Sequence, residues 1–171
     1  MSSKTSDARQ PFLGALMRHS WQWVWKQIVS GVLAAGYDDI TAAHIGMFRH
    51  PSLEGQRPSE LADQLQITKQ SVNDLLGHLE GAGYITRQPD ARDRRARVVR
   101  LTPKGRRLER TIRDHAQRAD QQIAQLLGNR RYSELRDTLQ QLSSHLATPE
   151  VASTSNGAAP DDRPTSWSSS P

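Results

Sequence analysis

Residues 84–105 constrain the fold of this chain more than any other segment. Their sequence, YITRQPDARDRRARVVRLTPKG, predicts a strand, a tight arginine-rich hairpin and a second strand that runs directly into a helix. Thr102 followed by Pro103 is a helix start, because an N-cap residue precedes a proline at the first helical position. Just before this segment, residues 59–66 and 68–81 show the apolar spacing of two short helices with almost no loop between them. A helix pair and a basic β-hairpin therefore belong to one small unit.

Apolar residues also recur at helical spacing on both sides of this unit. One stripe runs from Phe12 to Ala35, and a second runs for about 25 residues after Pro103. Gly36 and Gly128 are expected to end these two helices. A shorter helix is expected between Thr41 and Pro51, and Thr41, Ser59 and Thr68 are the expected N-caps of the three short helices. The last stripe alternates spacings of three and four, as a heptad seam does, and consists of Tyr132, Leu135, Leu139, Leu142 and Leu146.

Positive charge is concentrated in the hairpin and the start of the helix after it. Residues 87–107 hold nine basic and two acidic side chains, a net charge of +7, whereas the whole chain carries +5. The rest of the chain therefore sums to −2. A local basic patch favours a phosphate backbone as partner, because binding releases the counterions condensed on it. The alternative is a solvated arginine face that has no partner.

The flanking helices are too long and too apolar for one chain of this size to cover. The unit at 59–103 offers a small core, so the stripes of the first helix and of the last two need another surface. A second copy of the chain would supply the same helices in a two-fold dimer. Such a dimer would place two recognition helices roughly 34–36 Å apart, which matches a pseudo-palindromic site on double-stranded DNA. The alternative is packing of the stripes within one chain.

These observations predict a mainly α fold with a small β wing, that is, a winged helix-turn-helix flanked by long dimerisation helices. The predicted parts, in chain order, are a disordered N-terminus (1–10), an N-terminal dimerisation helix (11–38), a winged helix-turn-helix DNA-binding domain (39–103), C-terminal dimerisation helices (104–147) and a disordered tail (148–171).

The second helix of the pair carries polar residues opposite its apolar face. Glutamine and asparagine can read adenine, serine can contact a base edge or a phosphate, and lysine suits guanine or phosphate. A carboxylate near phosphates needs a cytosine amino group or an arginine as partner. The candidate reading residues are Lys69, Gln70, Ser71, Asn73, Asp74 and His78. The alternative for each of them is simple solvation.

The hairpin supplies the candidate wing contacts. Asp93 lies two residues before Arg95, so its carboxylate can fix the orientation of that arginine through a charged hydrogen bond. An arginine held in this way can enter a narrow minor groove. An ordinary hairpin salt bridge is the alternative. The candidate wing residues are Arg92, Asp93, Arg94, Arg95 and Arg97.

The run SELADQLQITKQSVNDLLGHLEGAGYITRQPDARDRRARVVRLTPKG resembles the MarR family of bacterial transcription regulators. The resemblance rests on the helix pair, on Leu-Glu-x-x-Gly-Tyr-Ile before the wing, on Asp-x-Arg at 93–95 and on Leu-Thr-x-x-Gly at 101–105, and it extends over about residues 11–147. It implies an intertwined homodimer that binds a palindromic operator and represses nearby genes. It also implies that Arg95 enters the minor groove and that Asp93 steadies it. One departure is Asp74, where many members carry a basic residue.

The resemblance further implies a small aromatic ligand that releases the protein from DNA. Such ligands bind in a crevice between the dimer helices and the DNA-binding lobe. The candidate ligand-binding residues there are Trp21, Trp25, Tyr37, His44 and Met47. Trp21 and Trp25 share a helix face and can stack on an aromatic ring, although they are equally suited to a dimer core.

Other classes of protein find little support in the sequence. The chain has no cysteine, which excludes disulfides, thiolate catalysis and thiol-based redox sensing. Asp74 and His78 lie four residues apart on one helix, but two ligands do not make a zinc site. Glycine loops for phosphates and nucleophile motifs are lacking, so we expect neither an enzyme nor a cofactor or metal. No apolar run approaches the roughly 18–20 residues that cross a bilayer. The lack of cysteine and of an apolar N-terminal stretch suggests a cytoplasmic address, and the resemblance implies a bacterial, nucleoid-associated protein.

Three functions remain compatible with the clustered arginines. The first is a sequence-specific DNA-binding regulator, which the polar face of residues 68–81 favours. The second is a winged-helix module that binds an acidic protein. The third is a non-specific, nucleoid-type DNA-binding protein.

Overall fold

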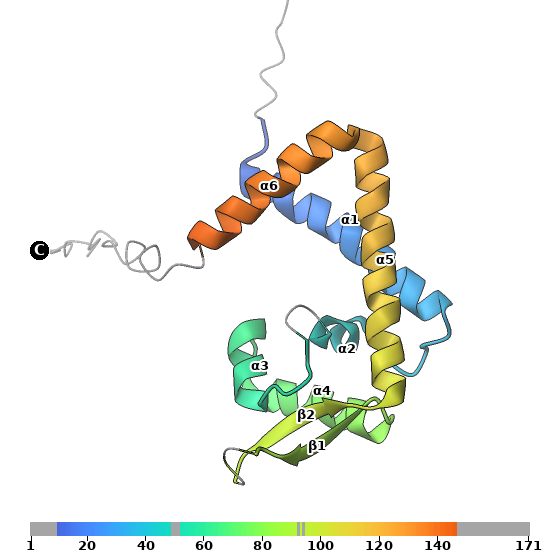
Figure 1. Ribbon diagram of the computed structural model, residues 1–171, viewed down its shortest axis with the longest axis vertical. Coiled ribbons are helices and arrows are strands. Elements are labelled where there is room, and N and C mark those ends of the chain that lie inside the picture. The colour runs from blue at the N-terminus through green and yellow to red at the C-terminus, as the bar shows by residue number, and fades with distance from the viewer. Residues whose placement is uncertain (1–9, 49–51, 92, 94, 147–171) are drawn as a thin grey trace, which may run out of the picture. The chain divides into compact units, whose positions relative to one another are not determined.

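The computed structural model describes residues 10–48, 52–91, 93 and 95–146. Within these ranges, helices and strands follow in the order α1 (Leu13–Ala34), α2 (Ala42–Met47), α3 (Pro58–Leu65), α4 (Lys69–Gly81), β1 (Ile85–Pro89), β2 (Arg97–Leu101), α5 (Pro103–Leu127) and α6 (Asn129–Leu146) (Figure 1). The predicted fold class, mainly α with a small β wing, is confirmed. The predicted disordered tail 148–171 lies outside the described residues, as does the predicted disordered N-terminus 1–10 apart from Gln10.

The chain forms two units, and the boundary between them falls within α5. The first unit extends to Gln122 and contains α1 to α4, the two strands and most of α5. The second unit begins at Ile123 and contains the end of α5 and all of α6. All candidate residues predicted from the sequence belong to the first unit.

Several helix ends lie where the sequence predicts them. Thr68 caps α4, and its Oγ1 accepts a hydrogen bond from the backbone N–H of Ser71 at 3.1 Å. Gly36 and Gly128 follow α1 and α5 closely and have φ angles of 91° and 77°, a left-handed conformation that glycine adopts without steric cost. The predicted end of the second helix at Pro51 lies outside the described residues, and α2 itself ends at Met47.

The prediction that Ser59 caps α3 is wrong. The N-cap is Arg57, and Pro58 occupies the first turn, where its missing N–H costs no hydrogen bond. The carboxylate of Glu60 accepts the backbone N–H of Arg57 at 2.7 Å, which satisfies a donor at the helix start. At the other end, Gln66 has a φ of 55° and terminates the helix at Leu65, one residue earlier than predicted.

The wing is a two-stranded antiparallel sheet in which Ile85 pairs with Leu101 and Pro89 pairs with Arg97. The segment before α3 lies along the other edge of β2. There the N–H of Gly55 donates to the carbonyl of Val99 at 2.8 Å, and the N–H of Val99 donates to the carbonyl of Gln56 at 2.9 Å. β2 is therefore bonded on both sides, which fixes the base of the wing against the helix pair.

One core joins the helix pair, the wing and the first part of α5. Apolar side chains from α1, α2, α4 and both strands are buried in it, and the largest fully buried one is Tyr84. Tyr84 precedes β1, and its carbonyl oxygen accepts hydrogen bonds from the N–H and the Oγ1 of Thr102, both at 3.0 Å. The same Oγ1 accepts the N–H of Gly105 at 3.1 Å, so Thr102 caps α5 as predicted.

The first turn of α5 approaches Tyr84 so closely that only glycine fits at position 105. Gly105 is buried, and a Cβ atom built there would overlap the carbonyl oxygen of Tyr84. This contact sets how α5 leaves the wing.

Gly105→Ala should therefore lower the free energy of unfolding by about 1–3 kcal/mol, because the backbone must shift to relieve the overlap. Urea denaturation followed by circular dichroism measures this. The matched control is Gly81→Ala, since Gly81 lies in α4 and a Cβ there meets nothing within 4 Å. Equal stability of the two variants would contradict the assigned contact.

Candidate nucleic-acid interface

The exposed face of α4 carries all the residues predicted to read DNA. Val72, Leu76 and Leu79 are buried and fix the rotation of the helix about its axis. The opposite positions are exposed, namely Lys69, Gln70, Ser71, Asn73, Asp74 and His78. The predicted residues therefore share one solvent-facing surface, but the structure divides them into bonded and unbonded side chains.

Asn73 is held by the wing. Its Oδ1 accepts a hydrogen bond from Nη1 of Arg87 in β1 at 3.2 Å, and its Nδ2 donates to the carbonyl of Lys69 at 3.0 Å. Glu80 completes this contact, because its carboxylate accepts the backbone N–H of Arg87 at 3.0 Å and lies 3.1 Å from Nε of the same residue. Both polar groups of Asn73 are therefore engaged within the protein.

His78 is held on the other flank of α4. Its Nε2 donates to the carbonyl of Asp39 in the α1–α2 loop at 2.7 Å, and its ring stacks on that of His44 with centroids 4.3 Å apart. Gln70 and Asp74 lie between these two flanks, and in the described part of the chain Asp74 forms no ion pair. Together with Lys69, these two side chains are the predicted residues of α4 for which the described part of the chain shows no side-chain hydrogen bond or ion pair.

The tip of the wing is shaped by Asp93. Its carboxylate accepts the backbone N–H of Arg95 at 3.0 Å, and its carbonyl accepts the N–H of Ala96 at 2.9 Å. The Asp93 carboxylate thus bonds to the backbone of Arg95 and supports the turn, whereas the sequence predicted a charged hydrogen bond to the Arg95 side chain. Arg95 and Arg97 are exposed, whereas Arg92 and Arg94 lie outside the described residues.

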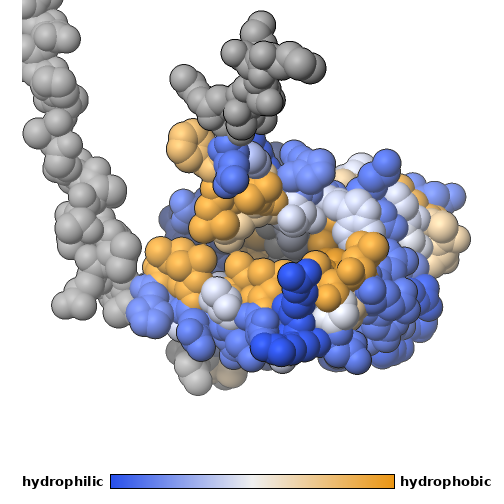
Figure 2. Space-filling model, turned by 90° about the horizontal axis from the view of Figure 1, so that it is seen from above, coloured by the Kyte–Doolittle hydropathy of each residue, from blue (hydrophilic) through white to orange (hydrophobic). Residues whose placement is uncertain are grey.

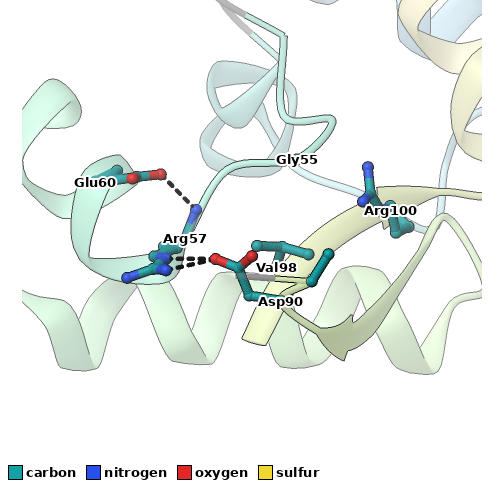
Figure 3. Close-up of a pocket in the computed structure, with 7 residues that line it drawn as sticks. Gly55, Arg57, Glu60, Asp90, Val98 and Arg100 are labelled. Carbon is teal, nitrogen blue, oxygen red and sulfur yellow. Dashed lines mark hydrogen bonds and ion pairs between the residues drawn. The ribbon is translucent and has the colours of Figure 1, made fainter. Parts of the chain in front are cut away.

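One ion pair beside the wing was not predicted. Nε and Nη2 of Arg57, at the start of α3, lie 2.9 and 2.5 Å from Oδ2 of Asp90, the residue after β1 (Figure 3). The pair borders a polar hollow of about 370 Å³ that Glu60 and Arg100 also line. No local sequence signal joins two residues that are 33 positions apart.

Comparison with known proteins identifies the unit that carries these residues. Residues 38–96, which contain the helix pair and the first strand of the wing, match the model of the MarR family.

Curated relatives match part of this chain. The transcriptional activatory protein BadR of Rhodopseudomonas palustris is 28% identical over 109 residues, which are 61% of this chain and 62% of BadR. The HTH-type transcriptional regulator PapX of Escherichia coli is 40% identical over 48 residues, which are 28% of this chain and 29% of PapX. The chain therefore spans about three fifths of BadR and under a third of PapX.

Solved structures of MarR regulators share the fold. A MarR transcriptional regulator from Methanosarcina mazei Go1 has a TM-score of 0.66 and 23% identity, over 80% of this chain and 96% of that one. The transcriptional regulator Tm0710 from Thermotoga maritima has a TM-score of 0.55 and 26% identity, over 78% of this chain and 92% of that one. The reduced form of MarR from Escherichia coli has a TM-score of 0.66 and 22% identity, over 78% of this chain and 97% of that one.

The residues predicted to bind a ligand lie in two places. Trp21 and Trp25 stack with ring centroids 5.8 Å apart and line an open hollow of about 730 Å³ between α1, α2 and the first part of α5. His44 and Met47 are buried in the core, and the Tyr37 hydroxyl lies 3.4 Å from Oγ1 of Thr111. Of the five predicted residues, only the two tryptophans border the hollow. Its other walls include Ile28, Phe48, Ile112, Glu109 and Arg113.

Two further features of the described ranges concern metals and membranes. No group of three or more histidine or acidic side chains is placed there so that it could hold a metal ion. Nor does any helix in these ranges combine the length and apolar character that a bilayer-spanning segment needs.

His44 is a buried titratable group that contacts α4, because its ring stacks on that of His78. Its Nδ1 accepts the backbone N–H of Thr41 at 3.1 Å and lies 2.9 Å from Oγ1 of Thr41, so this nitrogen is unprotonated when α2 is capped. Burial lowers the pKa of His44 below the usual 6.5, and the neighbouring His78 lowers it further. The carboxyl of Asp39 does not contribute in this pH range, because its pKa is lowered below the usual 3.8. The main cause is the hydrogen bond from Lys104, followed by the hydrogen bond from Tyr84.

The stability of the protein should therefore fall as the pH drops below about 6.5. The unfolded state takes up the proton of His44 first, because its pKa is the higher one, so the free energy of unfolding decreases until the pH reaches the folded pKa. Melting temperatures between pH 7.5 and 5 measure this. His44→Gln keeps an acceptor for Thr41 and should flatten the slope, whereas His19→Gln on the exposed side of α1 should not. Parallel slopes in both variants would rule out His44 as the cause.

Proposed function

We propose that this chain is a regulator of the MarR family, a homodimeric, sequence-specific DNA-binding protein that represses the transcription of nearby genes. The observation that carries the proposal is the exposed polar face of α4 beside an arginine-rich wing that is bonded to the same core. The names of BadR and PapX support a role in transcription. BadR is named as an activator, so a promoter fusion in a strain that lacks the protein is needed to test repression.

In this proposal, α4 and the wing contact different grooves of the DNA. α4 enters the major groove, where Gln70 reads adenine and Asp74 accepts from the exocyclic amino group of cytosine. The wing lies at the adjacent minor groove, which Arg95 enters. Lys69 and Ser71, in the first turn of α4, are placed for phosphates.

Dimerisation is supported by the apolar side chains that one chain leaves exposed. On α1 and just before it these are Phe12, Leu13, Leu16, Met17 and Trp21. On α6, where no described residue is buried, they are Leu135, Leu139 and Leu146. Figure 2 shows apolar residues gathered at the surface on the side of the molecule that is seen from above. Burying such stripes against a second copy is favourable by about 25 cal/mol per Å² of apolar surface.

Two other functions predict different binding behaviour. A nucleoid-type protein would bind any duplex, because phosphate contacts carry no sequence information. A module for an acidic protein would bind no duplex tightly. The unbonded amide and carboxylate of Gln70 and Asp74 favour the sequence-specific function, since neither group adds to a purely electrostatic attraction.

The test compares the upstream intergenic DNA of the protein's own gene with a scrambled duplex, by fluorescence anisotropy over a salt series. Tighter binding to the upstream DNA by about a thousandfold near physiological salt, with two chains per site, is expected. Gln70→Ala should relax the preference at one base step, whereas Arg95→Ala should weaken binding to every sequence and reduce the salt dependence. Equal, steeply salt-dependent binding to both duplexes would contradict sequence-specific regulation.

We further propose that a small aromatic compound binds in the hollow beside Trp21 and Trp25 and releases the protein from DNA. The stacked rings, the apolar walls and the volume of about 730 Å³ suit a compound of that class. The hollow is bordered by α2 and by α5, which also contact the winged unit, so a ligand there can change the position of that unit.

Titration with a panel of phenols and benzoates should quench the tryptophan fluorescence and lower the affinity for the upstream DNA. Trp25→Leu should abolish the quenching by the active compound. Trp23→Leu is the matched control, because Trp23 lies on the same helix but does not line the hollow. Quenching that survives Trp25→Leu but disappears with Trp23→Leu would place the ligand elsewhere.

A further inference from the structure

We propose that Arg57 is a positioning residue for the wing. Through its ion pair with Asp90, it holds Arg95 at the height and angle at which Arg95 meets the minor groove. The proposal rests on the proposed DNA-binding function, and it adds a residue that lies outside both the recognition helix and the hairpin.

The ion pair has the geometry of a specific contact. Oδ2 of Asp90 accepts from both Nε and Nη2 of Arg57, at 2.9 and 2.5 Å. The side chain of Asp90 is only 14% exposed and that of Arg57 is 34% exposed, so the pair is partly shielded from solvent. The hydrogen bond to Asp90 raises the pKa of the Arg57 guanidinium. Figure 3 shows the two side chains meeting across the gap between α3 and the end of β1.

Arg57 itself is held firmly by its neighbours. Its backbone N–H donates to the carboxylate of Glu60 at 2.7 Å, and it is followed by Pro58 at the start of α3. The carbonyl of Gln56, one residue before it, accepts the N–H of Val99 in β2. The guanidinium therefore extends from backbone that is fixed both to α3 and to the wing sheet.

From Asp90, a continuous series of hydrogen bonds leads to Arg95. The N–H of Asp90 donates to the carbonyl of Ala96 at 2.9 Å, and the N–H of Ala96 donates to the carbonyl of Asp93 at 2.9 Å. The carboxylate of Asp93 then accepts the N–H of Arg95 at 3.0 Å. A displacement of Asp90 is thus passed to the backbone of Arg95 through three contacts.

A positioning role of the Arg57–Asp90 ion pair and a purely structural role predict different effects on DNA binding. If the pair only stabilised the fold, its loss would weaken DNA binding by the same factor whether or not Arg95 is present. If it positions Arg95, its loss should matter only while the Arg95 side chain is there to be misplaced. Coupling between two substitutions is the quantity that distinguishes these cases.

The experiment is a double-mutant cycle on the upstream DNA, with full-length protein. Arg57→Ala should lower the affinity about tenfold in the wild-type background and less than about twofold in the Arg95→Ala background. Arg57→Lys should restore part of the affinity, because a lysine keeps the charge but not the two-nitrogen contact. Equal losses in the two backgrounds, or no loss in either, would overturn the proposal.

The matched control is Arg100→Ala. Arg100 lines the same hollow, but its guanidinium lies 3.2 Å from Glu54 and takes no part in the contacts that lead to Arg95. Whatever loss of affinity it causes should be the same with and without Arg95. A coupling as large as that of Arg57 would show that any arginine at this edge acts in the same way, which contradicts a specific role.

A second measurement needs no DNA, so it separates this proposal from the proposed function. In the free protein, Arg57→Ala should speed amide hydrogen exchange about tenfold at Asp90, Arg95 and Ala96, and leave exchange at Val99 unchanged. Unchanged exchange at the three amides would overturn the positioning role even if the protein binds its operator. Faster exchange in a protein that does not discriminate between DNA sequences would leave the role of Arg57 in the wing intact while the proposed function fails.

Discussion

The burial of Tyr84 is the constraint on which the arrangement of the winged unit depends. Its ring is fully buried, and its hydroxyl donates to Asp39 in the loop between α1 and α2. Its carbonyl accepts from Thr102, and Gly105 allows α5 to approach that same carbonyl. Lys104 lies 4.1 Å from the centre of the ring and also bonds to Asp39. A single residue therefore fixes the α1–α2 loop, the first strand of the wing and the start of α5, and burial together with Asp39 raises the pKa of its hydroxyl.

The same core carries both surfaces that are proposed to contact DNA. α4 rests on it through Val72, Leu76 and Leu79, and the wing rests on it through its two strands. Hydrogen bonds then lock the wing to α4 at Arg87 and to α3 at Arg57. The position of α4 relative to the base of the wing is consequently set within the free protein, so the proposed binding to DNA would cost little ordering free energy.

Short-range signals in the sequence predicted the helices and strands, but contacts between residues far apart in the sequence could not be predicted from it. Thr68, Gly36 and the Thr102–Pro103 pair determine helix ends through their own backbone chemistry, and the structure confirms them. The bond from Arg87 to Asn73 depends on how β1 is placed against α4, and no pattern within either segment contains that information. The outward-facing side of α4 could therefore be predicted, but not which of its polar groups are already engaged.

The two hydrogen bonds of Asn73 have a consequence for which residues of α4 can change during evolution. Replacing Asn73 would remove hydrogen bonds that hold the wing to α4 and would lower the stability of the protein. Gln70 and Asp74, in contrast, are exposed. Substitutions at these two positions leave the core and the wing contacts untouched, so they can accumulate while the protein stays folded. Under the proposed function, new operator preferences are accessible through a pair of residues one helical turn apart, so a library confined to these two positions can change the preference without disturbing the fold.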